Sequence, residues 1–224
     1  MSSLVFDIET VGFPFDGFDE QSQKYLLQYA KTPEEDKAAR EGMGFSPLTG
    51  QIVAIGAVNP DSKRGAVIYQ ARGAKAAEDV REGVQYIRVP DERALLERFW
   101  ETASHYRQFV TFNGRAFDAP FLHVRSAIHR LKPTRNLMPN RYYDDHIDLY
   151  DRLGFFGAVR KTMNLHMWCR AFGITSPKSH GVTGYDVAGL FTEGKYEDIA
   201  TYCMDDVFAT AELFRYWKDY INAK

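Results

Sequence analysis

Segments with strand-like and helix-like patterns of apolar residues are interspersed along the entire chain. Short strand-like stretches occupy residues 4–9, 51–58, 65–70, 109–112 and 146–149. Helix-like spacing of apolar residues occupies residues 19–30, 91–106, 117–128, 162–172 and 196–220. Such interspersion favours an α/β fold in which helices cover a central sheet. Because three strand-like segments precede most of the helices, we expect a mixed sheet of about five strands rather than an all-parallel sheet.

Residues 13–50 lie between the first two predicted strands and have a different character. The predicted helix at 19–30 is followed by a charged stretch after Pro33 and then by a segment rich in Gly, Ser and Pro at 42–50. This region lacks an apolar core of its own, so we interpret it as a helical insertion after the first strand. We therefore expect residues 1–224 to form a single domain, which is the natural expectation for this length.

The charges of the chain nearly cancel. It has 28 Lys and Arg residues against 30 Asp and Glu residues, which gives a formal net charge of −2. This balance argues against a basic protein that coats nucleic acid without regard to sequence. It does not argue against an enzyme that holds a nucleic-acid end beside a cluster of carboxylates.

No segment of the sequence predicts a membrane partner. The longest apolar run, residues 52–58, is far too short to cross a bilayer, and no basic and apolar leader precedes the first strand. The chain has only 2 cysteines, Cys169 and Cys203, which is typical of a reducing compartment. We expect a cytoplasmic protein.

The first motif with chemical content is Asp7-Ile8-Glu9, on the first predicted strand. Side chains of a strand alternate between its two faces, so Asp7 and Glu9 point to the same side. Two carboxylates on one face repel each other unless a cation lies between them, and their hard oxygens suit Mg²⁺ or Mn²⁺. One Asp-x-Glu is expected by chance in a chain of this length, so the motif alone decides little.

Two further motifs add carboxylates. Residues 113–122 lead from a predicted strand into a predicted helix, with Asp118 in its first turn, where the helix dipole also favours a purely structural acid. Tyr202 and Asp206 are four residues apart on the last predicted helix and therefore share one face. A structural tyrosine beside a solvated aspartate would show the same spacing.

Together and in this order, the three motifs resemble those of the DEDDy group of 3′–5′ exonucleases, in the DnaQ-like, RNase H-like superfamily. The matching segments are FDIET at 6–10, N-x-x-x-FD-x-PFL at 113–122 and Tyr202-Cys-x-x-Asp206, and they are most similar to the proofreading exonuclease domain of family B DNA polymerases. The sister group carries a histidine five residues before the last aspartate, where this chain has Thr201, so the tyrosine subtype is indicated. The resemblance implies an RNase H-like fold, from whose minimal core the insertion at 13–50 departs.

The resemblance also implies a chemistry. It is that of a metal-dependent 3′–5′ exonuclease, which hydrolyses terminal phosphodiesters of single-stranded DNA and releases 5′-nucleotides by a two-metal-ion mechanism. Asp7 would contact both divalent cations, Mg²⁺ or Mn²⁺, while Glu9 and Asp206 hold the one beside the attacking water and Asp118 holds the other. Tyr202 would orient that water, because a phenol with a reference pKa of about 10 is a poor free base.

Contacts with the 3′ end of a nucleic acid are implied, by the same resemblance, for Thr10, Asn113 and Phe117. Between Asp118 and Asp144 the chain has no acidic residue, and its basic side chains there suit phosphates as well as an ordinary solvated surface. These basic residues are Arg125, Arg130, Lys132, Arg135 and Arg141. Lys178 and His180 are weaker candidates for a phosphate contact, since a plain connecting loop would look the same.

Two alternative functions stay open. An exoribonuclease would use the same motifs, because none of these residues reads a 2′-hydroxyl and only the similarity to proofreading domains favours DNA. An inactive nucleic-acid-binding module is the alternative from another class. Such a module normally loses carboxylates, and this chain retains all of those in the pattern.

Overall fold

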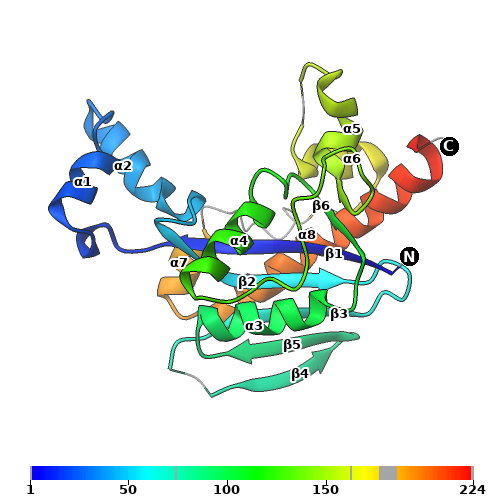
Figure 1. Cartoon of the computed structure of the whole chain (residues 1–224), viewed down its shortest axis with the longest axis horizontal. Helices are drawn as coiled ribbons and strands as arrows, with labels where there is room; N and C mark the ends of the chain where they lie inside the picture. The colour runs from blue at the N-terminus through cyan, green and yellow to red at the C-terminus, as the bar shows by residue number, and fades with distance from the viewer. Residues whose placement is uncertain (1, 74, 162, 177–185, 223–224) are drawn as a thin grey trace.

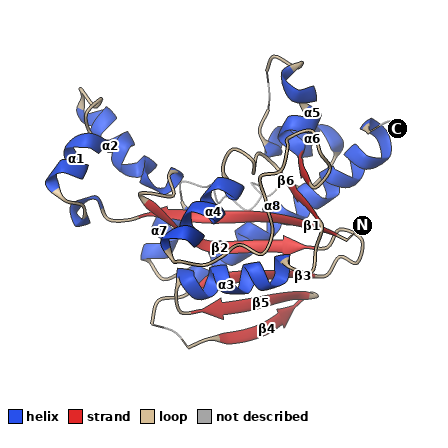
Figure 2. Ribbon diagram, in the orientation of Figure 1, coloured by secondary structure: helices blue, strands red, loops and turns tan. Residues whose placement is uncertain are grey.

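A mixed sheet of seven strands in the order β4-β5-β3-β2-β1-β6-β7 forms the centre of the molecule, with helices on both of its faces (Figure 1, Figure 2). The computed structural model describes residues 2–73, 75–161, 163–176 and 186–222. The strands are β1 (Ser3–Gly12), β2 (Gly50–Val58), β3 (Gly65–Gln70), β4 (Ala77–Arg81), β5 (Val84–Val89), β6 (Gln108–Thr111) and β7 (His146–Asp148). The α/β class and the mixed sheet predicted from the sequence are confirmed.

The α-helices among the described residues are α1 (Glu20–Leu26), α2 (Pro33–Glu41), α3 (Glu92–Ala103), α4 (Asp118–Ile128), α5 (Leu149–Leu153), α6 (Leu165–Phe172), α7 (Val187–Thr192) and α8 (Tyr196–Tyr216). Of these eight helices, five follow the predicted pattern with shifted ends, and three, α2, α5 and α7, lie where no helix is predicted. Short helical turns are η1 (Phe15–Gly17), η2 (Gly42–Phe45), η3 (Phe155–Gly157) and the π-helical end η5 (Trp217–Ile221). The predicted helix at 19–30 is thus shorter in the structure, and α2 occupies the charged stretch for which no helix was predicted.

The sheet has seven strands rather than about five because the hairpin β4–β5 adds two strands that are not among those predicted. The sequence of β5, VQYIRV, is rich in strand-forming residues, and most of them are buried, so this strand could have been recognised. All residues of β4 are exposed, so its sequence carries no alternation of apolar and polar positions. The hairpin turn is made by Glu82 and Gly83, which both have positive φ angles, of 50° and 84°. This combination is typical of the tight turns that join antiparallel strands.

The pairing of β1 leaves part of one strand edge open. β1 pairs along most of its length with antiparallel β2, but it pairs with parallel β6 only at Ser3–Val5. Beyond Val5, the edge of β1 that faces β6 has no strand partner within the described residues. That open edge lies next to the start of α4, and it carries the first acidic motif.

The alternating side chains of β1 enter two different cores. Val5 and Val11 join the core under α8, whereas Phe6 and Ile8 join the core under α3 and α4. Figure 1 shows α8 and the pair α3 and α4 on opposite sides of the strands. Because Asp7 and Glu9 alternate with Phe6 and Ile8, they face the α8 side, as strand geometry requires.

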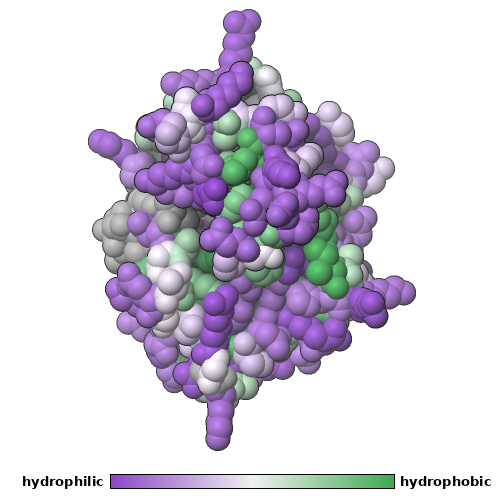
Figure 3. Space-filling model, turned by 90° about the vertical axis from the view of Figure 1, so that its left-hand side faces the viewer, coloured by the Kyte–Doolittle hydropathy of each residue, from purple (hydrophilic) through white to green (hydrophobic). Residues whose placement is uncertain are grey.

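The insertion between β1 and β2 extends away from the sheet as α1 and α2 (Figure 1). Neither helix contains a buried residue, so packing on the core contributes little to their stability. Interactions at the N-terminus of α2 stabilise this helix instead: Thr32 and Glu35 form a reciprocal capping box, and Pro33 occupies the first turn. Viewed from this side, the surface is mostly hydrophilic, with apolar residues in narrow patches (Figure 3).

A buried ion pair fixes the base of this insertion to the core. Arg125 on α4 and Glu92 on α3 are 5% and 4% exposed, and Arg125 Nη2 lies 2.6 Å from Glu92 Oε2. Glu92 also accepts the Ile52 backbone N–H at 2.8 Å. Arg125 Nη1 donates to the Pro47 carbonyl at 3.1 Å, and its guanidinium lies 5.2 Å from the centre of the Phe13 ring. One side chain thus contacts both ends of the insertion.

Replacing Arg125 with alanine should lower the free energy of unfolding by about 3–5 kcal/mol, since it leaves the buried Glu92 carboxylate without its main partner. Urea denaturation followed by circular dichroism measures this loss. The matched control is Lys24→Ala, whose ion pair with Glu20 is exposed and should contribute less than about 1 kcal/mol. Equal effects of the two substitutions would contradict the role given to Arg125.

Among the described residues, no helix has both the length and the apolar character that crossing a membrane requires.

Candidate active site

Strand β1 brings Asp7 and Glu9 to one face of the sheet, at a point where its pairing with β2 is irregular. The register between the two strands shifts between Glu9 and Thr10, which is a β-bulge. Bulges of this kind frequently lie beside functional sites, because they turn a side chain away from the regular pleat. Glu9 is buried, with 7% of its surface exposed, and Asp7 is partly buried.

Asp118 reaches the same place from the start of α4. Its Oδ1 accepts the backbone N–H of Ile8 at 3.1 Å, across a sequence separation of 110 residues. That N–H belongs to the open edge of β1, which a short β6 leaves without a strand partner. Asp118 is only 3% exposed. The carboxylate therefore satisfies a backbone donor and at the same time lies between the positions of Asp7 and Glu9 along the strand.

Tyr202 and Asp206 come from α8, which packs across β1, β2 and β3. The apolar stripe of α8, including Cys203 and Val207, faces the core and so directs the adjoining Tyr202–Asp206 face toward β1. Tyr202 is 8% exposed. Burial, the charges of Asp206, Glu9 and Asp7, and a hydrogen bond to Asp206 all raise the pKa of the Tyr202 hydroxyl. The phenol is therefore protonated at neutral pH.

Burial and neighbouring carboxylates raise the pKa values of the acids that converge here. Burial is the largest cause for both Asp7 and Glu9, followed by the charges of Asp118 and Asp206 on Asp7, and of Asp206 and Asp118 on Glu9. Burial, together with the charges of Asp148 and Asp206, raises the pKa of Asp118 from 3.8 to about 8, although two backbone hydrogen bonds oppose the shift. No basic side chain of the described residues is among the groups that act on Asp7 or Glu9. Uncompensated acids at this density are typical of sites that bind divalent cations.

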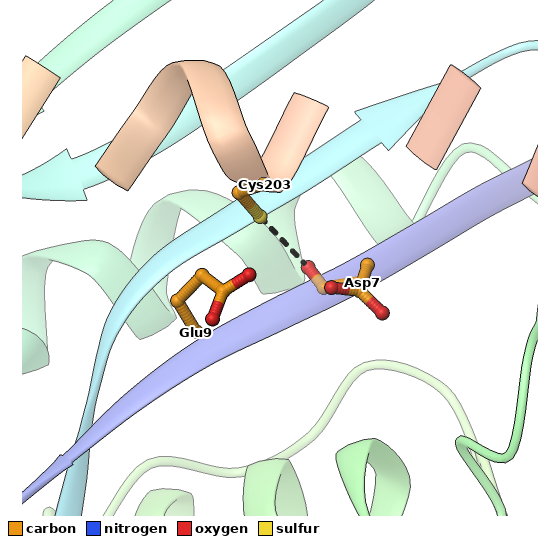
Figure 4. A group of neighbouring side chains, drawn as sticks. All are labelled: Asp7, Glu9 and Cys203. Atoms are coloured by element: carbon orange, nitrogen blue, oxygen red, sulfur yellow. Dashed lines mark hydrogen bonds between the residues drawn. The ribbon is translucent and has the colours of Figure 1, made fainter. Parts of the chain in front are cut away.

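Cys203 lies against the same acids, as Figure 4 shows, but two backbone groups already engage its thiol. Single ligand atoms of Asp7, Glu9 and Cys203 fall within 4.8 Å of one another. The thiol accepts the Gly56 N–H at 3.1 Å and donates to the Asp7 carbonyl at 3.6 Å. Burial and the nearby carboxylates raise its pKa well above 9.0, which disfavours the thiolate. We assign Cys203 to the packing of α8 on the sheet, which leaves the carboxylate oxygens as the candidate ligands for a cation.

Asp148 orders the connection that leads to Asp118. Its two carboxylate oxygens accept the backbone N–H groups of Asn113 and Arg115, at 2.7 and 2.9 Å. Asn113 has a positive φ of 64°, in the left-handed region, which Asn adopts more readily than most residues. The charge of Asp148 is also one of the causes that raise the pKa of Asp118. Asp148 therefore acts on the acidic cluster both through this connection and through its charge.

A cavity of about 560 Å³ adjoins Glu9, and Thr10 and Phe117 line it. The Phe117 ring is partly buried and contacts Phe121, with 5.4 Å between the ring centres. Asn113 is exposed and does not line this cavity. The structure thus brings two of the three predicted substrate residues to one cavity next to the acids.

Most of the basic residues after Asp118 have structural partners instead of an open surface. Arg125 is buried against Glu92, as described above, and Arg135 donates to the carbonyls of Ser104 and Tyr106. Arg141 pairs with Asp151. The sequence pattern did not separate these roles from phosphate binding, because pairing partners are distant in the chain. Lys178 and His180 lie outside the described residues.

Three relatives share sequence with this chain. It is 38% identical over 85 residues to the DNA polymerase epsilon catalytic chain of Saccharomyces cerevisiae, and 28% identical over 148 residues to that of Dictyostelium discoideum. It spans only 3% and 6% of those proteins, from 35% and 56% of its own length. An uncharacterized protein of Methanocaldococcus jannaschii is 28% identical over 187 residues, which are 78% of this chain and 90% of that protein.

A solved structure supports the fold. The family B DNA polymerase of the archaeon Pyrobaculum calidifontis superposes with a TM-score of 0.61 over 96% of this chain and 24% of the polymerase chain. The identity is 18%, so this likeness concerns the fold alone. It agrees with the RNase H-like arrangement expected from the three motifs.

The family match covers most of the chain. A family described as predicted 3′–5′ exonucleases related to the exonuclease domain of PolB matches residues 48–219. The match includes Asp118, Tyr202 and Asp206, and it begins after β1, so Asp7 and Glu9 are brought into the site by the structure rather than by the match. This chain belongs to the family of predicted 3′–5′ exonucleases related to the exonuclease domain of family B DNA polymerases.

Proposed function

We propose that this chain is a metal-dependent 3′–5′ exonuclease that removes 5′-nucleotides from the 3′ end of single-stranded DNA. One observation carries the proposal: the charges of Asp118 on α4 and Asp206 on α8 both act on the two buried carboxylates of β1, so acids from three elements share one site. Acids held together in this way are costly to a fold, and a functional role is the common reason for keeping them.

The donor set fits divalent cations with a preference for oxygen. Asp7, Glu9, Asp118 and Asp206 would hold the ions, with Asp7 central because the charges of the other three all act on it. Two such ions, when bound, would supply positive charge to the attacking and leaving oxygens of a phosphodiester. Hard carboxylate ligands suit Mg²⁺ or Mn²⁺.

Tyr202 is suited to orienting a water molecule because its hydroxyl is protonated at neutral pH. Its raised pKa keeps the proton on the phenol, so the hydroxyl can donate or accept a hydrogen bond but cannot act as a base at neutral pH. Its hydrogen bond to Asp206 fixes the direction of the hydroxyl. We assign Tyr202 to orienting the water that attacks the phosphodiester.

Tyr202→Phe should lower kcat by about 10- to 100-fold without abolishing cleavage, because the water is still present but is oriented less well. Steady-state hydrolysis of a 5′-labelled oligonucleotide in Mg²⁺ measures this. The melting temperature should change by only a few degrees, since the ring is retained. Full activity, or complete loss of it, would contradict the orienting role.

The residues proposed to contact the substrate lie next to the acidic site. Thr10 and Phe117 line the cavity beside Glu9, where a terminal nucleotide would lie next to the acids. Asn113 would contact the sugar-phosphate backbone from the exposed connection before α4. DNA is favoured because two relatives are catalytic chains of DNA polymerases, and an exoribonuclease is the alternative.

Digestion of matched deoxy and ribo oligonucleotides, each labelled at the 5′ end, tests the proposal. We expect a ladder of strands shortened from the 3′ end, release of 5′-mononucleotides, and faster digestion of DNA. Faster digestion of the ribo strand would establish the exoribonuclease instead. Internal cuts, trimming from the 5′ end, or no digestion in Mg²⁺ or Mn²⁺ would refute the exonuclease assignment.

A further inference from the structure

The insertion after β1 supplies one wall of the cavity beside Glu9. The cavity of about 560 Å³ is lined on the core side by residues that include Glu9, Thr10 and Phe117. On the other side it is lined by Glu41 at the end of α2 and by Gly44 and Phe45 of η2. The volume lies within the range of pockets for small molecules.

The η2 turn is held tightly against the end of β1. The Thr10 hydroxyl donates to the Gly44 carbonyl, and the Thr49 hydroxyl to the Met43 carbonyl, both at 2.7 Å. Gly12 permits this contact, since a Cβ there would lie 2.9 Å from the Met43 Cβ. At Gly44, a Cβ would lie 3.1 Å from the Gly12 nitrogen. Both distances are shorter than ordinary van der Waals contact.

The buried Arg125–Glu92 pair also holds the η2 turn, from the side of α3 and α4. Arg125 contacts the Pro47 carbonyl just after η2, and its guanidinium faces Phe13 just after β1. The turn is therefore fixed at both ends of the insertion, and Phe45 is positioned in the cavity wall before any ligand arrives. A wall fixed in advance reduces the entropy lost on binding.

The residues that line the cavity indicate the chemical class of ligand that it can bind. None of the described residues that line it carries a positive charge, and Glu9 and Glu41 are both acidic. Glu41, which is not among the proposed cation ligands, disfavours a phosphate on its side of the cavity. Phe45 and Phe117 present aromatic rings from two separate segments, and Phe45 is 56% exposed. An uncharged flat group, such as a nucleobase, is the part of a nucleic acid that fits.

We propose that Phe45, from the insertion, is a positioning residue that contacts the base of the 3′-terminal nucleotide, with Phe117 as its counterpart on the core. This rests on the proposed exonuclease function and assigns the insertion a part in substrate binding. The base contact holds the terminal nucleotide so that its phosphodiester lies at the acids, while Glu41 disfavours a strand that ends in a 3′-phosphate.

The test compares two DNA strands that are identical except for the 3′-terminal residue, which is a normal deoxyadenosine or an abasic tetrahydrofuran. On the normal strand, Phe45→Ala should lower kcat/KM by about tenfold, mainly through a higher KM, as expected for loss of one stacked base. On the abasic strand, Phe45→Ala and the wild type should differ by less than about twofold, because the base that Phe45 contacts is missing. Phe45→Trp should restore most of the activity on the normal strand.

Leu48→Ala is the matched control, since Leu48 is an exposed apolar residue of the same insertion that does not line this cavity. It should behave as the wild type on both strands. Normal kcat/KM of Phe45→Ala on the deoxyadenosine strand, or equal loss on both strands, would overturn the role of Phe45 while leaving the exonuclease assignment intact. A wild-type protein that releases no 5′-mononucleotides from either strand would overturn both.

Discussion

Asp7→Ala and Asp206→Ala should each lower the rate of phosphodiester cleavage by about 1,000-fold or more, to the limit of detection. Asp7 is the acid on which the charges of Glu9, Asp118 and Asp206 all act, and Asp206 also accepts the hydrogen bond from Tyr202. Loss of either carboxylate would remove a proposed ligand of the divalent cations. The positive charge of these cations would stabilise the transition state by several kcal/mol. Single-turnover digestion of a 5′-labelled strand in Mg²⁺ measures the loss.

Folding should survive these two substitutions. Burial, and after it the charges of the neighbouring acids, raise the pKa values of Asp7 and Glu9, so the ionised carboxylates destabilise the folded protein. Removing one charge should therefore leave the free energy of unfolding in EDTA unchanged or higher. Asp205→Asn is the matched control, because Asp205 is the neighbour of Asp206 on α8 but borders a separate small cavity with Ile174 and Ser176. Turnover near the wild-type rate in Asp7→Ala would eliminate the two-metal interpretation.

Removal of divalent cations should abolish cleavage and make the stability of the protein depend on pH. Asp118 has a pKa of about 8 in the folded protein against an ordinary 3.8, so the folded state binds more protons between these values. The stabilisation from this group is complete below pH 3.8 and is lost as pH rises toward 8. In EDTA, the melting temperature should therefore be higher at pH 6.5 than at pH 8.0.

Two histidines act in the opposite direction in this interval. Burial lowers the pKa of His146 to about 4 and also lowers the pKa of His123, so near pH 6.5 these side chains bind more protons in the unfolded than in the folded state, and their contribution to stability rises with pH. The contribution of Asp118 is therefore measured by comparing the wild type with a variant that lacks this carboxylate. The carboxyls of Asp19, Asp36 and Asp79 have lowered pKa values and titrate in more acidic solution. Asp118→Asn should reduce the difference between the melting temperatures at pH 6.5 and pH 8.0, because this variant lacks one of the carboxyl groups whose pKa is raised by folding.

Mn²⁺ should restore cleavage, raise the melting temperature at pH 8.0 and reduce its dependence on pH, since bound cations stabilise the ionised carboxylates. At 100 times the dissociation constant, one bound ion would add about 2.7 kcal/mol to the free energy of unfolding. Differential scanning fluorimetry in EDTA and in Mn²⁺ gives the comparison. An identical melting temperature in both media, with the same activity, would contradict cation binding at this site.

Local periodicity was sufficient to predict much of the site. The alternation of a strand places Asp7 and Glu9 on one face, and the helical spacing of four residues places Tyr202 beside Asp206. The three motifs in order then indicated the family, which the match to residues 48–219 confirms. These features depend on short segments whose geometry the sequence dictates by itself.

Other features depend on contacts between distant segments and could not be predicted. The hydrogen bond from Ile8 to Asp118 exists because β6 pairs with only a short part of β1. Arg125 was indistinguishable from a phosphate ligand until its partner on α3 was known. The β4 strand has no buried face, so it leaves no alternating pattern to recognise.

Crystals of the protein soaked in Mn²⁺, with anomalous diffraction recorded at the manganese edge, give the most direct test of the site. We predict two peaks about 3.5–4 Å apart, the spacing of two-metal sites, within coordination distance of carboxylate oxygens of Asp7, Glu9, Asp118 and Asp206. No peak among these side chains, with manganese bound elsewhere or nowhere, would contradict the account of a two-cation exonuclease centre.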